Sequence, residues 1–292
     1  MAILHVRHTT RYEYRVPVEL GEHRLMMRPR DSHDLRLIDT HLVIEPPTSS
    51  LRWIHDVFGN SIALASFGTA AQSLQFTSEF RAEHFPAAPQ QLALESYAER
   101  FPFSYSAQES EDLGRTKERH YADPEHEIDR WAQAQLQSVA EGRTLETLAA
   151  MTSSIKQQFR YVPRDAPGTQ TPLETLKGGS GSCRDFALFM MEAARSLGLA
   201  ARFVSGYLYD ERLVGAQGGL VGSGATHAWL QVFLPGAGWV EYDPTNALIG
   251  GRNLIRVAVA RDPSQAQPLT GSFTGPTDAF IAMKVSVEVA AE

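Results

Sequence analysis

The chain has 292 residues, of which 43% are hydrophobic and 21% charged, and its formal net charge at pH 7 is −7. This length exceeds what most single hydrophobic cores contain and suits two domains. The composition is typical of a globular protein, and the negative charge argues against nucleic acid or an anionic membrane as the main partner.

The sequence does not predict a targeting or membrane segment. Its first ten residues lack the long apolar core of a signal peptide, and no apolar run approaches transmembrane length. The single cysteine, Cys183, permits no internal disulfide. We therefore expect a cytoplasmic protein, because the cytoplasm is a reducing compartment. The sequence sets no expectation for the oligomeric state.

Residues 1–88 contain short runs that alternate apolar and polar side chains, separated by turn residues. One junction, Gly59-Asn60, is a strong signal for a tight hairpin. Evenly spaced short strands predict an antiparallel β-sandwich or a curved sheet for this first domain. The expected strands cover residues 3–7, 11–15, 23–28, 37–45, 51–58, 61–67 and 73–85.

Histidines are frequent in this first domain, but their spacing is not that of a metal site. We interpret them as solvated or singly hydrogen-bonded strand residues and expect no metal or other cofactor. The domain is expected to act as a scaffold or to shape one wall of a cleft. The histidines are His5, His8, His23, His33, His41, His55 and His84.

Residues 89–292 are expected to form the second domain, after a proline-containing linker over residues 86–91. Asp123-Pro124 and Thr144 are expected to cap two helices. Strands are expected over 200–209, in a hairpin over 226–245, and at the C-terminal end of this domain, over 254–260 and 279–289. The glycine-rich stretch 210–224 is equally consistent with a flap over a cleft and with a surface connection.

The residues on both sides of Cys183 predict that a helix begins there. The glycine-rich turn over 177–181 is followed by Ser182 as a candidate N-cap, Asp185 as its acidic partner at N3, and Gly198 as a stop signal. Cys183 would then lie in the first turn, where free N–H groups and the helix dipole favour a thiolate. A lone cysteine is more often a small buried hydrophobe, so its role depends on its partners.

Two candidate partners lie downstream of Cys183. His227 begins one strand of the predicted hairpin, and Asp243 ends the other. In a register whose paired residue numbers have an even sum, both side chains point to the same sheet face and lie close together. Asp243 could then orient the imidazole, whereas a slip of one residue would place the two on opposite faces.

Three segments resemble the core motifs of bacterial transglutaminase-like cysteine enzymes. They are Gly-Ser-Cys-Arg-Asp-Phe at 181–186, Thr-His-Ala-Trp-Leu-Gln-Val at 226–232 and Gly-Trp-Val-Glu-Tyr-Asp-Pro-Thr-Asn at 238–246. The resemblance implies Cys183 as nucleophile, His227 as base and Asp243 as orienting acid on a papain-like core. The first ninety or so residues resemble the β-rich domain that often precedes this core. The expected fold class is therefore α+β.

The resemblance implies acyl transfer on amide bonds through a thioester, ending in hydrolysis or transglutamination. The expected partners are a protein or peptide substrate and, for transglutamination, a primary amine. The backbone N–H of Cys183 is one oxyanion donor, but residues 177–182 lack the glutamine that papain-type enzymes use. The Tyr161 hydroxyl could donate a hydrogen bond to the oxyanion, or the side chain could simply pack in the core. The sequence has no run of acidic residues that would suggest a calcium site. The resemblance assigns no role to Arg261 or Asp262.

Two other functions are considered. A peptide-binding or scaffold protein could keep this fold without the chemistry, although Cys183, His227 and Asp243 all retain the residue types that the chemistry needs. A metal-dependent hydrolase is disfavoured, because one cysteine and one late histidine are too few ligands.

Overall fold

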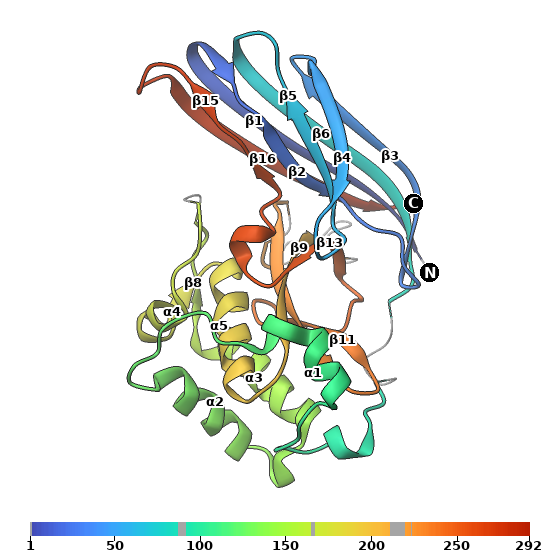
Figure 1. Cartoon of the computed structure of the whole chain (residues 1–292), viewed down its shortest axis with the longest axis vertical. Helices are drawn as coiled ribbons and strands as arrows, with labels where there is room; N and C mark the ends of the chain where they lie inside the picture. The colour runs from blue at the N-terminus through green and yellow to red at the C-terminus, as the bar shows by residue number, and fades with distance from the viewer. Residues whose placement is uncertain (1, 87–91, 165–166, 211–219, 223) are drawn as a thin grey trace.

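The computed structural model describes residues 2–86, 92–164, 167–210, 220–222 and 224–292. Two parts lie one above the other along the long axis of the molecule (Figure 1). The upper part consists of strands, and the lower part combines helices with an antiparallel sheet. The structure therefore confirms the α+β class with an N-terminal β-rich region.

The upper part is built from two antiparallel sheets. β16 (Phe280–Ala291) and β6 (Ala71–His84) pair on either side of β1 (Ala2–Leu20), β3 (Leu35–Glu45) follows β6, and β15 (Phe273–Thr274) pairs with the end of β1. The second sheet has the order β14 (Leu269–Thr270), β2 (His23–Arg28), β5 (Ser61–Ser66) and β4 (Ser50–His55). An apolar cluster from both sheets, including Leu25, Ala63 and Phe76, fills the space between them.

Two predictions for this part are wrong in detail. The sequence predicts separate strands over 3–7 and 11–15, but β1 continues through Thr9 and Thr10, because β-branched residues fit an extended strand and neither is a turn residue. The sequence also places the C-terminal strands in the second domain, 89–292. Strands β14–β16 instead complete the sheets of the upper part. An alternating pattern identifies a strand but not its partner.

The lower part is organised around the sheet β12 (Leu248–Ile249), β11 (Gly238–Asp243), β10 (His227–Leu234), β9 (Ala201–Leu208) and β13 (Leu254–Ala260). Helix α5 (Cys183–Ser196) packs against one face of this sheet. Its Phe186 and Met190 share an apolar cluster with Leu230, Val232 and Tyr242 of β10 and β11.

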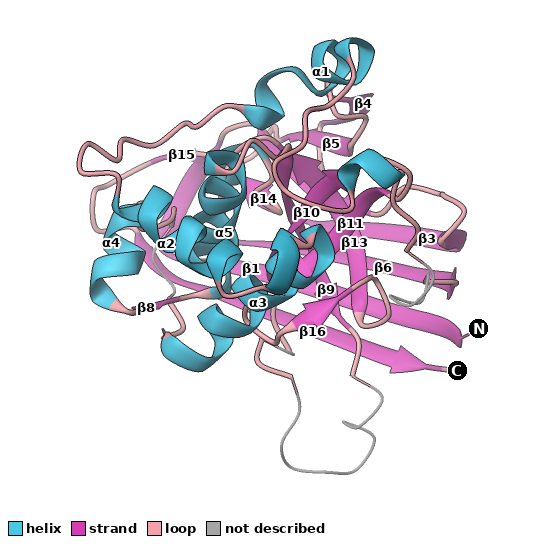
Figure 2. Cartoon of the chain, turned by 90° about the horizontal axis from the view of Figure 1, so that it is seen from below, coloured by secondary structure: helices cyan, strands magenta, loops and turns pink. Residues whose placement is uncertain are grey.

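Helices α2 (Glu127–Gln137), α3 (Thr144–Gln158) and α4 (Pro172–Gly178) gather around α5, whereas α1 (Ala107–Leu113) lies apart from them, as the view from below shows (Figure 2). A short parallel pair, β7 (Arg160–Tyr161) and β8 (Ser180–Gly181), leads into α5. Single 3₁₀ turns cover Ser96–Ala98, Gly114–Lys117, Ala140–Gly142 and Pro263–Gln265. Among the described residues, no helix is both long and apolar enough to cross a membrane.

The two predicted helix starts lie close to the observed ones but differ in their caps. Asp123 accepts hydrogen bonds from the backbone N–H groups of Glu127 and Ile128, so it caps α2 from four residues before the helix. Thr144 is the first residue of α3, and its hydroxyl donates to the carbonyl of Ala98 instead of capping the helix. The local sequence thus predicts roughly where a helix begins, but it does not predict which residue occupies the N-cap position.

A continuous contact joins the upper and lower parts. Leu4, Phe80 and Val287 of the upper part share an apolar cluster with Tyr207 and Ile255 of the lower sheet. Elsewhere in this contact, the buried side-chain amide of Asn60 accepts a hydrogen bond from the N–H of Val259 at 2.9 Å and donates to its carbonyl at 2.6 Å. Asn60 thereby satisfies both backbone groups of an edge-strand residue.

We predict that Asn60→Ala lowers the free energy of unfolding by about 2–4 kcal/mol, because it leaves a buried N–H and carbonyl without partners. Urea unfolding followed by circular dichroism measures this loss. Gln72→Ala, on the exposed surface of β6, serves as the control and should change stability by less than about 0.5 kcal/mol. Equal effects of the two substitutions would contradict the role of Asn60.

Candidate active site

The predicted capping box places Cys183 at the start of α5. Asp185 Oδ2 accepts hydrogen bonds from the backbone N–H and the hydroxyl of Ser182, both at 2.8 Å. The interaction is buried, since only 1% of Asp185 is exposed. The first turn of α5 is therefore fixed on both sides of Cys183, as the sequence predicts.

Asp185 also anchors a segment that the sequence analysis did not connect to this helix. Its Oδ1 accepts hydrogen bonds from the backbone N–H of Gln170 and from Arg164, both at 2.7 Å. Gly181 makes this close packing possible, because a Cβ there would lie 2.8 Å from the Asp185 Cβ. One carboxylate thus joins the turn before α4 to the helix that carries the cysteine.

The hairpin of β10 and β11 brings His227 and Asp243 together. Leu230 pairs with Tyr242, so of the two registers that the sequence leaves open the structure has the one with an even sum. His227 Nε2 lies 2.9 Å from Asp243 Oδ2. Both side chains are buried. The histidine ring and the carboxylate therefore form a hydrogen-bonded pair inside the protein.

Two residues near Asp243 in the sequence donate further hydrogen bonds to its carboxylate. The sequence alone did not predict this role for either of them. Asn246 Nδ2 donates to Oδ2 at 2.9 Å, and the backbone N–H of Thr245 donates to Oδ1 at 2.9 Å. Asn246 also exchanges two hydrogen bonds with the backbone of Val221. The residues after β11 therefore orient the carboxylate and hold Val221, the neighbour of Gly222, in place.

Opposite charges dominate the electrostatics of this buried pair. Burial alone lowers the pKa of His227, but the charge and hydrogen bond of Asp243, aided by the Cys183 sulfur, raise it to about 10. Burial acts to raise the pKa of Asp243, yet its interactions with His227, Asn246 and Thr245 hold that pKa below its usual value. The pair is therefore an imidazolium and a carboxylate at neutral pH.

The other ring nitrogen, Nδ1, has no hydrogen-bond partner among the described residues. The Cys183 sulfur still acts on this ring, since its charge contributes to the raised pKa of His227. Gly222 borders the same nitrogen: a Cβ on it would lie 2.8 Å from Nδ1. The ring also stacks on Trp229, with centroids 6.0 Å apart.

Cys183 borders a cavity of about 270 Å³. Its residue exposure is 8%, and His227 lines the same cavity. The far wall comes from the upper part, through Met283 and Val285 of β16. The three residues that the sequence predicts as a site, Cys183, His227 and Asp243, thus lie together, and the first two face a common space. The glycine-rich stretch 210–224, for which the sequence leaves a flap and a surface connection open, lies largely outside the described residues.

Tyr161 lines this cavity and also packs, so both sequence interpretations describe part of its environment. Its ring makes an edge contact with Phe186, at 6.4 Å between centroids. Burial first, and then the negative charge of Cys183, raise the pKa of Tyr161 to about 12. The hydroxyl therefore stays protonated at neutral pH and is available as a hydrogen-bond donor.

Family comparisons agree with this architecture. Residues 4–83 match the bacterial transglutaminase-like N-terminal region, and residues 130–244 match the transglutaminase-like superfamily. Cys183, His227 and Asp243 all lie within the second match. The family match supports a cysteine-dependent enzyme in general.

Similar proteins cover either the whole chain or one segment of it. An uncharacterized protein of Mycobacterium tuberculosis is 28% identical, over 97% of this chain and 91% of its own length. One of Mycobacterium leprae is 35% identical over 41% of this chain, and the match spans 42% of that protein. A solved structure from Cytophaga hutchinsonii, named a putative cysteine protease, superposes with a TM-score of 0.73 over 100% of this chain and 91% of its own, at 17% identity.

The charged pair predicts a pH dependence of stability. Because folding raises the pKa of His227 from 6.5 to about 10, its charge stabilises the folded state fully below pH 6.5, and this contribution is lost as the pH rises through about 10. The difference in unfolding free energy between the wild type and His227→Gln should therefore shrink from about pH 6.5 to about pH 10. Urea unfolding across this range measures it. The exposed His126→Gln variant is the control, and a difference that grows with pH would contradict the pair.

Gly222 provides a test of the ring position. Gly222→Ala would force the new Cβ against His227 Nδ1, whereas a Cβ on Gly224 meets nothing within 4 Å, and both glycines have positive φ. We expect Gly222→Ala to slow iodoacetamide alkylation of Cys183 at neutral pH roughly tenfold, and Gly224→Ala to leave it nearly unchanged. Equal rates in the two variants would show that residue 222 does not constrain the ring.

Proposed function

Since residues 4–83 and 130–244 belong to the bacterial transglutaminase-like N-terminal and core families, we propose that this protein transfers acyl groups from amide bonds through a thioester on Cys183. His227 would act as the base and acid, and Asp243 would orient it. The observation that carries the proposal is the buried His227–Asp243 pair, whose second ring nitrogen is left for the cysteine at the cavity.

The proposed first step is attack by the Cys183 thiolate on the carbonyl carbon of an amide. The carbonyl oxygen becomes an oxyanion, for which the backbone N–H of Cys183 at the start of α5 is a donor and the protonated Tyr161 hydroxyl a second candidate. His227 then gives its Nδ1 proton to the departing nitrogen as the C–N bond breaks, which releases an amine and leaves a thioester.

In the second step the neutral His227 accepts a proton from the attacking molecule. Water would yield a carboxylic acid, and a primary amine would yield a new amide, while the thiolate is the leaving group in both cases. The three residues serve either outcome. We propose hydrolysis or transamidation of a polypeptide without calcium, and the single cysteine supports a reducing compartment such as the cytoplasm.

The open edge of β16 supports a polypeptide substrate. The N–H of Val287 donates to the carbonyl of Gly224, away from β1, and backbone direction alternates along a strand. The backbone groups of Met283 and Val285 therefore point to the same open side, and β1 is the described strand with which β16 pairs. An extended peptide beside the cavity could pair with this edge, and the side chains there are apolar.

The test is incubation with a glutamine-rich protein and a labelled primary amine. We expect shorter fragments for hydrolysis or label incorporation for transamidation, and either activity should fall by at least about a thousandfold in Cys183→Ser and His227→Ala. Arg100→Gln, on the exposed surface, should keep full activity. A product that persists in Cys183→Ser would overturn the proposal.

If neither shorter fragments nor labelled protein form, the rate of Cys183 alkylation distinguishes an enzyme from a scaffold protein. An activated thiolate should react with iodoacetamide below the pH at which a free thiol ionises, and His227→Ala should remove that advantage. Identical pH profiles for the wild type and His227→Ala would favour a peptide-binding scaffold that has lost the chemistry.

A further inference from the structure

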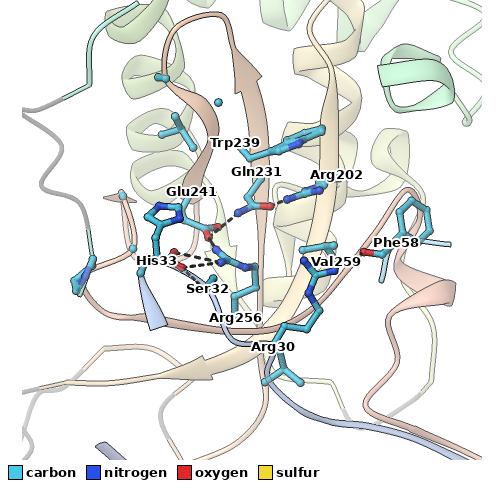
Figure 3. Close-up of a pocket in the computed structure, with 18 of the residues that line it drawn as sticks. Arg30, Ser32, His33, Phe58, Arg202, Gln231, Trp239, Glu241, Arg256 and Val259 are labelled. Atoms are coloured by element: carbon cyan, nitrogen blue, oxygen red, sulfur yellow. Dashed lines mark hydrogen bonds and ion pairs between the residues drawn. The ribbon is translucent and has the colours of Figure 1, made fainter. Parts of the chain in front are cut away.

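A second cavity, of about 370 Å³, lies where the upper and lower parts meet (Figure 3). It is lined by the segment that connects β2 to β3, by the β4–β5 turn and by strands of the lower sheet. None of its lining residues borders the cavity at Cys183. Its volume falls within the range of small-molecule sites, which favour domain interfaces.

Three guanidinium groups, those of Arg30, Arg202 and Arg256, line this second cavity, and only one of them is neutralised within it (Figure 3). Arg256 pairs with Glu241 at 2.7 Å and with Asp34 at 3.1 Å. Arg30 donates to the backbone carbonyls of Phe58 and Gly59. Two carboxylates thus face three guanidinium groups.

Arg202 is the group without a counter-ion. Its Nε donates to Gln231 at 2.6 Å, and its guanidinium lies over the Trp239 ring, 4.0 Å from the centroid. No carboxylate of a described residue lies within ion-pair distance of it. Burial above all, and then the nearby charges of Arg256 and Arg30, lower its pKa to about 9 against the attraction of Glu241.

Glu241 is held by three other donors and makes no ion pair with Arg202. Its two oxygens accept hydrogen bonds from the Trp229 indole at 2.5 Å, from Gln231 at 2.7 Å and from Arg256 at 2.7 Å. A largely buried cation that lacks a carboxylate partner is costly, and an anion in the cavity would remove that cost. The positively charged side of the cavity therefore favours the binding of a negatively charged ligand.

Part of the cavity wall is apolar, although Ser32, His33, Asn60 and Gln231 also line it, and this apolar part restricts the ligand further. A fully hydrated inorganic anion would leave this wall without a partner, whereas an organic anion would cover it. The planar guanidinium fork matches a carboxylate through two parallel hydrogen bonds. The apolar lining residues are Phe58, Pro86, Leu92, Ala237, Trp239, Val240, Val257 and Val259.

We propose that this cavity binds a small organic carboxylate, with its charged group at Arg202 and Arg30 and its apolar body against the wall. The site is separate from Cys183, so the proposal does not depend on the proposed acyl-transfer activity. Hexanoate is a suitable probe, with hexanol supplying the apolar body alone and acetate the charge alone.

The experiment is titration calorimetry on the full chain at constant ionic strength with each of the three probes. We expect hexanoate to bind, and hexanol and acetate to bind at least tenfold more weakly. Arg202→Gln should weaken hexanoate at least tenfold, while Arg100→Gln, an exposed arginine elsewhere, and Cys183→Ser should bind it as the wild type does.

Arg30→Gln is the second variant, because Arg30 is exposed and its loss does not threaten the fold. It should also weaken hexanoate. Absence of hexanoate binding up to about 10 mM, equal binding of hexanol, or undiminished binding in both Arg202→Gln and Arg30→Gln would overturn the proposal. Loss of binding in Cys183→Ser would overturn it as well, since the ligand would then lie in the other cavity.

Discussion

The pairing of His227 with Asp243 is the interaction on which the candidate site depends. Both side chains are buried, and moving two charges out of water is expensive unless their geometry and hydrogen bonds compensate. Here the compensation is local: Asn246 and the Thr245 backbone satisfy the remaining positions of the carboxylate. The register of β10 with β11 is therefore a chemical requirement, because a shift of one residue would bury two separate charges.

One face of the lower sheet packs against α5, and the other carries polar groups beside a second apolar cluster. Leu230, Val232 and Tyr242 pack with α5, so the alternate residues lie on the opposite face with His227 and Asp243. On that face Trp229 stacks on His227 and donates to Glu241, which in turn binds Arg256. One stacking contact and a series of hydrogen bonds thus connect the imidazole to Asp34 of the upper part, which Arg256 also binds.

Features set by neighbouring residues could be predicted from the sequence. Ser182 and Asp185 form their capping box within one helical turn, and the predicted hairpin brings His227 and Asp243 onto neighbouring strands, although the observed register was needed to place both on one face. The roles of Arg164 on Asp185 and of Asn60 on Val259 could not be predicted, because each joins segments whose meeting depends on the whole fold. The same holds for Arg202, which looks like an ordinary strand residue until its neighbours are known.

The pairing of β16 with β1 makes the cavity at Cys183 a product of both ends of the chain. Val285 lies opposite Thr10 and Met283 opposite Tyr12, so the first strand positions the wall that faces the cysteine. The cavity therefore requires β1, α5, β10 and β16 together, although the family match to the core ends at residue 244. Since β1 and β16 also pack on the lower sheet through Leu4, Tyr207 and Val287, the upper part contributes to the shape of the site and is more than an attached module.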